Sequence, residues 1–377
     1  MKRTITSFLA VTALVSTGCV SNLPEYDGEV AGKPGLLLEE FVFTDVPFPQ
    51  CHASTLEETE DGLVVAWFGG THEKHEDVGI WFARLTSSGW TQPVELVNGI
   101  QHADKRYPCW NPVLFQPKEG PLLLFYKVGP NPREWWGELI TSDDNGRTWS
   151  EPRRLPEDIL GPVKNKPIQL ANGDILCGSS TEHSEKGWLA HFEITSDNGK
   201  TWRKIGPVNT KEEFNAIQPA LLRLADGSIK ALCRTRENVA SEVTSKDGGV
   251  VWSLMKASKL PNPNAGFDTV TLDNGTHAII YNHTTRATGN RGRLNVAVSG
   301  DAVNWLAALE LEHEKAEFSY PAIIQTSDGL IHATYTWKRR RVKHVVIDPE
   351  KLRPMGMNID GSWPEERKLW SFRQEGR

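Results

Sequence analysis

Six strand-like segments of the chain align with one another, and five of the six residues at one matching position near their starts are polar or ionisable. Each segment is a short alternating apolar run that ends at a Gly-containing turn. The residues at the aligned position are Ala53, Asn111, Lys166, Gln218, Asp268 and Tyr320. The residues one place earlier are His52, Trp110, Asn165, Ile217, Phe267 and Ser319. Convergent polar groups beside a His and aromatic rings are typical of a ligand site. A water-filled channel lined by satisfied polar groups is the alternative.

Neighbouring strand-like runs add further polar groups at their ends. A polar loop at 69–77 carries His72, His75 and Asp77, and Arg234 directly follows the apolar run 229–233. The spacing of the two His and the Asp matches neither a zinc-binding helix nor a calcium loop. We therefore expect no metal and no other cofactor.

Two adjacent tryptophans, Trp135 and Trp136, allow two interpretations. An indole ring combines a large apolar face with a polar N–H. That combination suits a sugar-stacking platform as well as packing between sheets, and the sequence leaves both open.

One short pattern returns along the chain and indicates what positions these groups. Ser-x-Asp-x-Gly-x-Thr-Trp at 142–149 recurs with small changes at 195–202 and 245–252. A degenerate copy of the pattern follows at 299–305. In the first repeat, Trp90 is the one residue of the pattern that is present. The tryptophans recur about every fifty residues, which suits a four-stranded propeller blade. Within the turn, Asp accepts backbone N–H bonds, Gly takes the left-handed conformation and Trp fills the gap between units.

Six such units predict an all-β, six-bladed propeller over residues 35–377. Most of the innermost strands end at Asp-Gly or Asn-Gly, which are hairpin signals. Second strands are expected at 63–68, 122–126, 229–233 and 331–335. The strand at 36–43 has no unit of its own, so we expect it to pair into the last blade. Closing the ring in this way removes exposed sheet edges.

Composition indicates a soluble, mildly acidic protein. The net charge is −6 and the mean hydropathy is −0.42, so nucleic acid is not an expected partner. The basic run at 338–341 is interpreted as a charged edge strand that resists aggregation.

The N-terminus resembles an export signal. Lys2 and Arg3 precede an apolar run at 8–15, and small residues lead into Cys19. Small residues before a Cys resemble a bacterial lipobox, with a plain signal peptide as the alternative. The hypothesis is a lipoprotein-type signal at 1–19 with lipidation at Cys19, and a tether at 20–34. The protein would then be exported to the periplasm or outer membrane, with membrane contact through the lipid anchor only.

Four further cysteines are expected inside the propeller. Cys51 and Cys109 occupy matching places in successive repeats. They form either a disulfide, if their Cα atoms come close enough, or two small buried thiols. Cys177 and Cys233 complete the set.

The Asp/Trp turns resemble the Asp-boxes of the sialidase superfamily, over roughly residues 45–350. This resemblance implies a substrate carboxylate held by three Arg, a Tyr nucleophile activated by a Glu, and an Asp acid/base. By the same resemblance, Tyr320 fits the nucleophile, Asp77 the acid/base and Arg234 the second Arg. Arg291 or Arg293 fits the third Arg.

Two positions depart from the family pattern. His52 stands where the first Arg is expected, and Gln218 stands where the activating Glu is expected. Loss of one clamp Arg weakens carboxylate binding by about 1.5–3 kcal/mol. Because an amide cannot act as a base, His52 is the nearest residue type able to take the proton of Tyr320.

The resulting hypothesis is an exo-acting glycosidase that removes a terminal acidic sugar, sialic acid or a uronic acid, from a glycan. The predicted catalytic residues are Tyr320, Asp77 and His52. The predicted substrate-binding residues are Arg234, Arg291, Asn111, Gln218, Lys166, Asp268 and Trp110. One alternative is a polysaccharide lyase in which His52 pairs with Tyr320 or Tyr107, beside Arg234 and Asn111. Another is a glycan-binding lipoprotein without catalysis.

Overall fold

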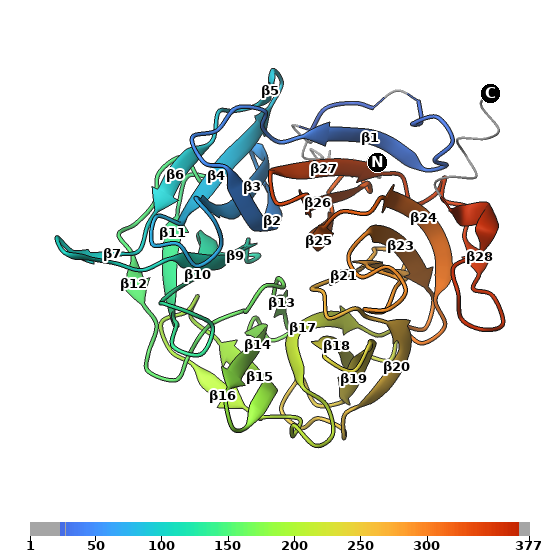
Figure 1. Ribbon diagram of the computed structural model, residues 1–377. Helices are drawn as coiled ribbons and strands as arrows, with labels where there is room; N and C mark the ends of the chain where they lie inside the picture. The colour runs from blue at the N-terminus through green and yellow to red at the C-terminus, as the bar shows by residue number, and fades with distance from the viewer. Residues whose placement is uncertain (1–22, 27, 369–377) are drawn as a thin grey trace, which may run out of the picture.

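The computed structural model describes residues 23–26 and 28–368, so Cys19 and the predicted signal lie outside the described residues. Six four- or five-stranded antiparallel sheets stand around a central axis like the blades of a propeller (Figure 1). The one helical element among the described residues is the 3₁₀ turn η1 (Glu365–Arg367). The predicted all-β, six-bladed propeller is therefore confirmed.

The first three blades follow one another along the chain. Blade 1 contains β2 (Gln50–Thr59), β3 (Gly62–Gly70), β4 (Gly79–Thr86), β5 (Gly89–Trp90) and β6 (Val94–Val97). Blade 2 contains β9 (Cys109–Phe115), β10 (Leu122–Val128), β11 (Trp136–Ser142) and β12 (Arg153–Arg154). Blade 3 contains β13 (Ile168–Gln169), β14 (Ile175–His183), β15 (Gly187–Thr195) and β16 (Arg203–Ile205).

The last three blades complete the ring. Blade 4 contains β17 (Ala216–Arg223), β18 (Ile229–Thr235), β19 (Val239–Ser245) and β20 (Lys256–Pro261). Blade 5 contains β21 (Asp268–Thr271), β22 (His277–Tyr281), β23 (Arg293–Ser299), β24 (Leu306–His313) and β28 (Met355–Gly356). Blade 6 contains β25 (Phe318–Gln325), β26 (Ile331–Trp337), β27 (Arg341–Ile347) and the N-terminal β1 (Leu36–Phe41).

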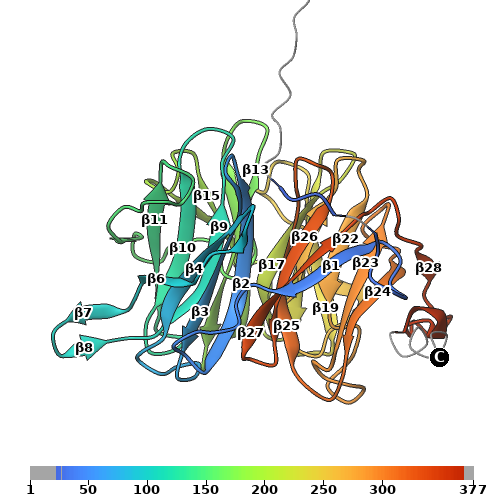
Figure 2. The same ribbon diagram turned by 90° about the horizontal axis from the view of Figure 1, so that it is seen from above.

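The N-terminal strand closes the ring, as the sequence predicted. β1 pairs antiparallel with β27, from Leu36 opposite Ile347 to Phe41 opposite Lys343. This pairing corrects one interpretation, because β27, which follows the basic run, has partners on both sides and is no edge strand. A hairpin that the sequence did not reveal, β7 (Ile100–His102) and β8 (Lys105–Arg106), projects from the side of the disc (Figure 2).

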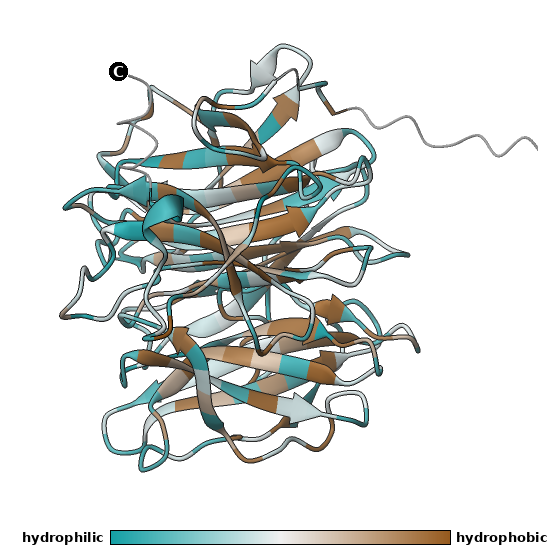
Figure 3. Cartoon of the chain, turned by 90° about the vertical axis from the view of Figure 1, so that its right-hand side faces the viewer, coloured by the Kyte–Doolittle hydropathy of each residue, from teal (hydrophilic) through white to brown (hydrophobic). Residues whose placement is uncertain are grey.

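The core lies between the blades. Apolar clusters join strands of neighbouring blades, one of them uniting Val64 and Ile80 of blade 1 with Leu124 and Ile140 of blade 2. Figure 3 shows apolar bands along the strands and polar loops at both faces. Cys51, Cys109, Cys177 and Cys233 are buried free thiols. Among the described residues, no helix has the length and apolar character to cross a membrane.

The Asp/Trp turns have the geometry that their sequence suggests. Asp197 accepts hydrogen bonds from the N–H of Thr201 (2.8 Å) and from its hydroxyl (2.7 Å), and Gly199 has a φ of 85°. The Trp202 ring packs edge-on against Phe125 of the preceding blade, with ring centroids 5.9 Å apart. Trp149 contacts Phe82 of the preceding blade edge-on in the same way, whereas Trp252 stacks face to face on Phe192, with ring centroids 3.7 Å apart. All three rings are half-buried, so they cover the seams between blades from the outside.

Candidate active site

The innermost strands of four blades bend at the same place. A residue there has a left-handed backbone, and the pairing register slips beside it. These residues are Ala53 (φ 56°), Asn111 (φ 38°), Gln218 (φ 57°) and Tyr320 (φ 53°). A left-handed conformation costs about 1–2 kcal/mol for a residue with a Cβ. Strain that persists at equivalent positions is typical of functional sites. We call the face at which these strands begin the mouth of the channel.

Tyr320 stands at the centre of the side chains around the mouth. Its hydroxyl oxygen accepts hydrogen bonds from the Arg234 guanidinium and from Gln218 Nε2 (3.3 Å). The ring lies against His52, with ring centroids 4.1 Å apart. Its other neighbour is Arg291, whose guanidinium carbon is 5.8 Å from the ring centre. Two guanidiniums therefore lie beside the Tyr320 side chain, one of them bound to its oxygen.

Arg234 is held in place on several sides. Its Nε donates to Asn264 Oδ1 (2.8 Å) and one NH donates to Gln218 Oε1 (3.3 Å). The guanidinium also lies 5.3 Å from the Trp188 ring. Burial lowers the pKa of Arg234 from its ordinary value, and Arg291 lowers it further, while Tyr320 acts in the opposite direction. Arg234 is only 8% exposed, and these contacts hold its planar guanidinium in one orientation.

A second group of charges forms an arc beside Tyr320. Glu317 Oε1 accepts a hydrogen bond from Arg291 (2.8 Å), and its Oε2 accepts one from Arg339 (3.0 Å). Arg339 reaches on to Glu73 of the first blade (2.5 Å), and Ser319 donates to Glu317 (2.8 Å). These ion pairs fix two guanidiniums beside the mouth.

His52 is a neutral side chain in this environment. Its Nδ1 forms a hydrogen bond with Thr336 Oγ1 (2.8 Å), and only 2% of the residue is exposed. Burial lowers the pKa of His52 well below its ordinary value, and the positive charges of Arg339, Arg291 and Arg234 lower it further. The imidazole is therefore a weak base before any anion binds.

Asp77 lies on the loop between β3 and β4. Its carboxylate accepts from the Thr71 N–H (2.9 Å) and hydroxyl (2.6 Å), and it lies 2.7 Å from His75 Nδ1. Partial burial raises the pKa of Asp77, but the hydrogen bonds from Thr71 and His75 outweigh it and leave the pKa below its ordinary value. The side chain is 41% exposed. His72 lines a small cavity with His52 and Arg339, so this loop borders the mouth.

Lys166 and Asp268 lie further along the channel and bind one another. Lys166 Nζ is 2.9 Å from Asp268 Oδ2, which also accepts from the N–H of Ile323, three residues along β25 from Tyr320. In blade 3 the left-handed residue is Lys164 rather than Lys166. Lys164 Nζ donates to Asn165 and to two backbone carbonyl groups of blades 5 and 6. The structure thus brings Lys164, two places earlier than the sequence alignment, into contact with the backbone carbonyl of Pro321, next to Tyr320.

The structure separates several residues that the sequence left as alternatives. Arg293 forms its hydrogen bond with His313 on the next strand (3.0 Å), so Arg291 is the one beside Tyr320. Tyr107 packs against Trp136 in blade 2, with ring centroids 5.5 Å apart. Trp110 is buried and donates to Gly129 O (2.8 Å).

Sequence reasoning missed Glu317 and Arg339. The sequence pattern predicts a charged edge strand at Arg339, but this residue lies on the left-handed turn between β26 and β27, where its φ is 58°. Glu317 comes directly before β25, three residues ahead of Tyr320. The only available signal was this proximity, because the two residues lie 22 positions apart and their further partners, Arg291 and Glu73, belong to other blades.

Together, the fold and the site place the chain among proteins built from repeated Asp-box blades. The family model described as "BNR repeat-like domain" matches residues 61–333, and the chain belongs to this family. More specifically, it is a divergent, sialidase-like member.

Two relatives support this assignment. The chain is 23% identical to the anhydrosialidase of Macrobdella decora over 231 residues, which are 53% of this chain and 30% of that protein. It is 25% identical to the sialidase of Clostridium perfringens over 191 residues, which are 44% of this chain and 48% of that protein. The chain thus spans less than half the length of each.

Solved structures share the fold. The NanB sialidase of Streptococcus pneumoniae superposes with a TM-score of 0.66 at 13% identity, over 83% of this chain and 71% of that one. A protein of unknown function from Dyadobacter fermentans superposes with a TM-score of 0.67 at 15% identity, over 85% of this chain and all (100%) of that one.

Proposed function

We propose that the protein is an exo-acting glycosidase that removes a terminal acidic sugar, sialic acid or a uronic acid, from a glycan. The observation that carries this proposal is the Tyr320 hydroxyl, which is bound by Arg234 and flanked by Arg291. Fixed guanidiniums bind a carboxylate bidentately. They would hold the sugar's carboxylate while the Tyr320 oxygen faces the anomeric carbon.

In the proposed first step, the Tyr320 oxygen forms a bond to the anomeric carbon as the bond to the leaving oxygen breaks. Asp77 is ionised in the free protein, so it would have to bind a proton before this step, and it gives that proton to the leaving oxygen. In the second step, water attacks the same carbon, the bond to Tyr320 breaks, and Asp77 takes the proton of the water. The proton that Tyr320 lost in the first step returns to its oxygen, which leaves the enzyme as it began.

The proton of Tyr320 needs an acceptor, and we assign it to His52. Burial lowers the pKa of His52, and three arginines lower it further. A substrate carboxylate would neutralise part of their charge. The basicity of His52 would therefore rise when the substrate binds. Gln218 cannot accept the proton, because its Nε2 donates to the same oxygen.

The amide at Gln218 favours a second candidate function. A glycan-binding protein without catalysis would keep the arginine clamp and would not need a base beside Tyr320. A lyase that uses His52 and Tyr320 beside Arg234 and Asn111 is a further outcome of the test below.

The decisive experiment exposes the purified protein to sialylated and uronate-capped oligosaccharides and reads the products by mass spectrometry. A hydrolase adds one water across the cleaved bond. A lyase adds none and leaves an unsaturated product, whereas a binding protein leaves the oligosaccharides intact. Release of the acidic sugar with water supports the proposal, and either other result refutes it.

We also propose that the protein is an exported lipoprotein anchored through Cys19, as its N-terminal pattern suggests. An extracytoplasmic location would bring the mouth of the propeller to glycans outside the cytoplasm.

A further inference from the structure

The two faces of the disc are formed by different turns. Each innermost strand begins at the mouth, so the third strand of a blade also begins there and ends at the opposite face. The Asp/Trp turns at 142–149, 195–202, 245–252 and 299–305 follow third strands, so all four lie on the face opposite the mouth. We call this face the Asp-box face, and Figure 2 shows the disc edge-on.

Exposed apolar side chains gather on the Asp-box face. Among the described residues, eight large apolar side chains are exposed, and Val251 (66%) and Leu254 (84%) are two of them. The turns of blades 4 and 5 are neighbours, because Lys259 of blade 4 donates to Asn304 of the blade 5 turn. Five of the eight lie in or just after these two turns, and we call them the apolar patch: Val250, Val251, Leu254, Val303 and Leu306.

The turn of blade 4 does not need these apolar residues in order to fold. At the place of Val251, blades 2 and 3 have Thr148 and Thr201, whose hydroxyls donate to the Asp of the turn (2.6 and 2.7 Å). Valine cannot form that hydrogen bond. At the place of Leu254, blade 2 has Glu151. Apolar side chains thus meet water where the same turn accepts polar ones, and such exposure is typical of an interaction surface.

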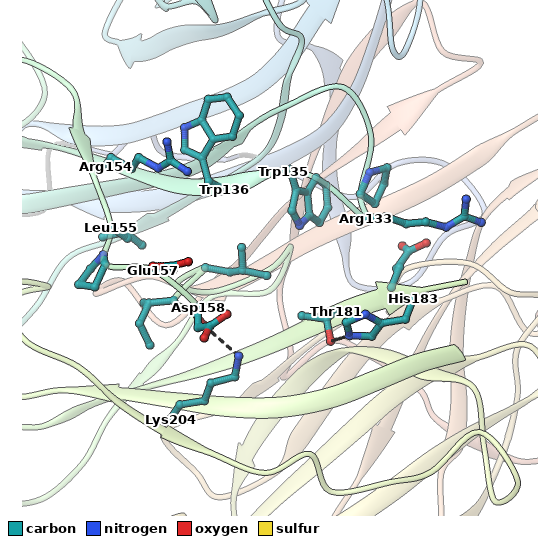
Figure 4. Close-up of a pocket in the computed structure, with 15 residues that line it drawn as sticks. Arg133, Trp135, Trp136, Arg154, Leu155, Glu157, Asp158, Thr181, His183 and Lys204 are labelled. Carbon is teal, nitrogen blue, oxygen red and sulfur yellow. Dashed lines mark hydrogen bonds between the residues drawn. The ribbon is translucent and has the colours of Figure 1, made fainter. Parts of the chain in front are cut away.

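A groove of about 530 Å³ continues the apolar surface from the turn of blade 4 to the outer edge of blade 3. Pro207 and Val208 line it beside the patch. The pocket between blades 2 and 3 has a different character, because charged side chains surround it and Lys204 donates to the carbonyl of Asp158 (2.9 Å, Figure 4). The groove therefore extends the area that an apolar partner could cover.

Basic side chains flank the patch. The outer strands β16 of blade 3 and β20 of blade 4 contain no acidic residue and carry four basic ones, Arg203, Lys204, Lys256 and Lys259. The acidic residues of the two turns, Asp247 and Asp301, accept hydrogen bonds from N–H groups of their own turns. Apolar side chains between basic ones suit the surface of a bilayer with anionic headgroups, because long basic side chains reach the headgroups while apolar ones enter below them.

The N-terminal chain joins the fold at the same face. β27 begins beside the mouth, after the turn that holds Arg339, so its last residue, Ile347, lies at the Asp-box face. Leu36, the first residue of β1, is paired with Ile347. Tyr26 packs against His332, the second residue of β26, with ring centroids 5.9 Å apart. The described chain before β1 therefore lies at the Asp-box end of blade 6.

This position also limits where a lipid on Cys19 could be. Cys19 comes seven residues before Tyr26, and seven residues span at most about 25 Å. An acyl chain at Cys19 would therefore extend from the side of blade 6, whereas the apolar patch lies on blades 4 and 5. Contacts at both places would fix the plane of the disc, which one flexible attachment cannot do.

We propose that the apolar patch and its basic flanks rest on a phospholipid bilayer with anionic headgroups, so that the mouth of the propeller faces away from the membrane. The inference rests on the proposed anchoring through Cys19 for the membrane concerned. The patch is a second, weaker attachment that orients the anchored protein. The site around Tyr320 is then presented to glycans in the aqueous space and not to the headgroups of the membrane beneath.

The test uses the full chain with Cys19→Ala, so that no acyl chain contributes, and vesicles of phosphatidylethanolamine and phosphatidylglycerol at millimolar lipid. Co-sedimentation should show binding that is weak enough to be lost on washing. Val251→Thr/Leu254→Glu, which installs the residues of the blade 2 turn, should lower the partition coefficient about tenfold or more, since two large apolar side chains no longer enter the bilayer. The matched control, Val94→Thr/Ile100→Glu, changes two exposed side chains of blade 1 and the β7–β8 hairpin, and it should stay within twofold of the parent.

A second measurement locates the contact. A polarity-sensitive fluorophore attached to Val250→Cys should shift its emission to shorter wavelength when the vesicles are added. The same fluorophore on His102→Cys, in the β7–β8 hairpin, should not shift. The four native cysteines of the propeller are buried and do not compete for the label.

The inference is overturned if the patch variant binds vesicles as well as the control does, or if the parent protein does not bind them. It is also overturned if the patch variant changes only the sedimentation coefficient of the protein, because the patch would then be an interface between two copies of the chain. Vesicle binding that depends on the patch, in a protein whose Cys19 carries no lipid in cells, would refute the proposed anchoring alone.

Discussion

Replacing Gln218 by Glu would supply the carboxylate that the Tyr320 hydroxyl lacks. Gln218 Nε2 lies 3.3 Å from the Tyr320 oxygen, and its Oε1 lies 3.3 Å from an NH of Arg234. Glu has nearly the same shape, so one carboxylate oxygen would face the phenol and the other would face the guanidinium. The donor beside Tyr320 would become an acceptor.

The surroundings decide whether a charge at this position is tolerated. Gln218 is 4% exposed, and burying a carboxylate costs several kcal/mol. Its attraction to Arg234 across 3.3 Å is about 5 kcal/mol at an effective dielectric constant of about 20. The two terms nearly cancel, so we expect the free energy of unfolding to change by less than about 2 kcal/mol.

The catalytic gain follows from what a positioned base contributes. General-base assistance is worth about 10²–10⁴-fold, and it should increase kcat while KM stays close to the wild-type value. The assay measures kcat and KM on aryl glycosides of sialic acid and a uronic acid, with urea unfolding as the check on folding. Gln218→Met, which removes the hydrogen bonds without adding a base, is the matched control. A folded Gln218→Glu protein that is no faster than Gln218→Met would refute the nucleophile assignment of Tyr320.

Three further predictions use other parts of the molecule. Tyr320→Phe keeps the ring contacts, so it should lower kcat by about 10³-fold or more with little change in substrate affinity; activity within tenfold of wild type would mean that another atom attacks. Burial raises the pKa of Glu57 to about 7 from its ordinary 4.5, so its stabilising contribution is complete below about pH 4.5 and is lost as the pH rises through about 7. Glu57→Gln should therefore exceed the wild type in unfolding free energy by up to about 3 kcal/mol at pH 8 and match it near pH 4, measured by urea denaturation; a constant difference across pH would contradict this reasoning. Cys19→Ala should move the protein from the membrane fraction to the soluble fraction, as followed by immunoblotting, and membrane retention of the variant would rule out the lipid anchor.

The sequence by itself determined the repeated architecture, because local hydrogen bonds specify it. The hydrogen bonds of Asp197 and Gly199 join residues of the same turn, all within seven residues of chain. The pattern is therefore visible without any knowledge of the fold. The innermost strands and the ring-closing strand β1 were predictable for a related reason, since alternation and hairpin turns are local signals. Tyr320 and Arg234 were found because they begin or end such strands.

Only the tertiary structure decided how the charges around Tyr320 are paired. The Arg339–Glu73 contact joins residues 266 positions apart, and the Arg234–Tyr320 contact joins residues 86 positions apart. These pairs form when the blades close into a ring, and no local pattern in the sequence predicts which residues will meet. Contacts between blades also place Arg291, not Arg293, beside Tyr320, and they join Lys164 to the Pro321 carbonyl next to Tyr320. Ring closure also surrounds His52 with positive charge, and burial together with that charge keeps the imidazole neutral.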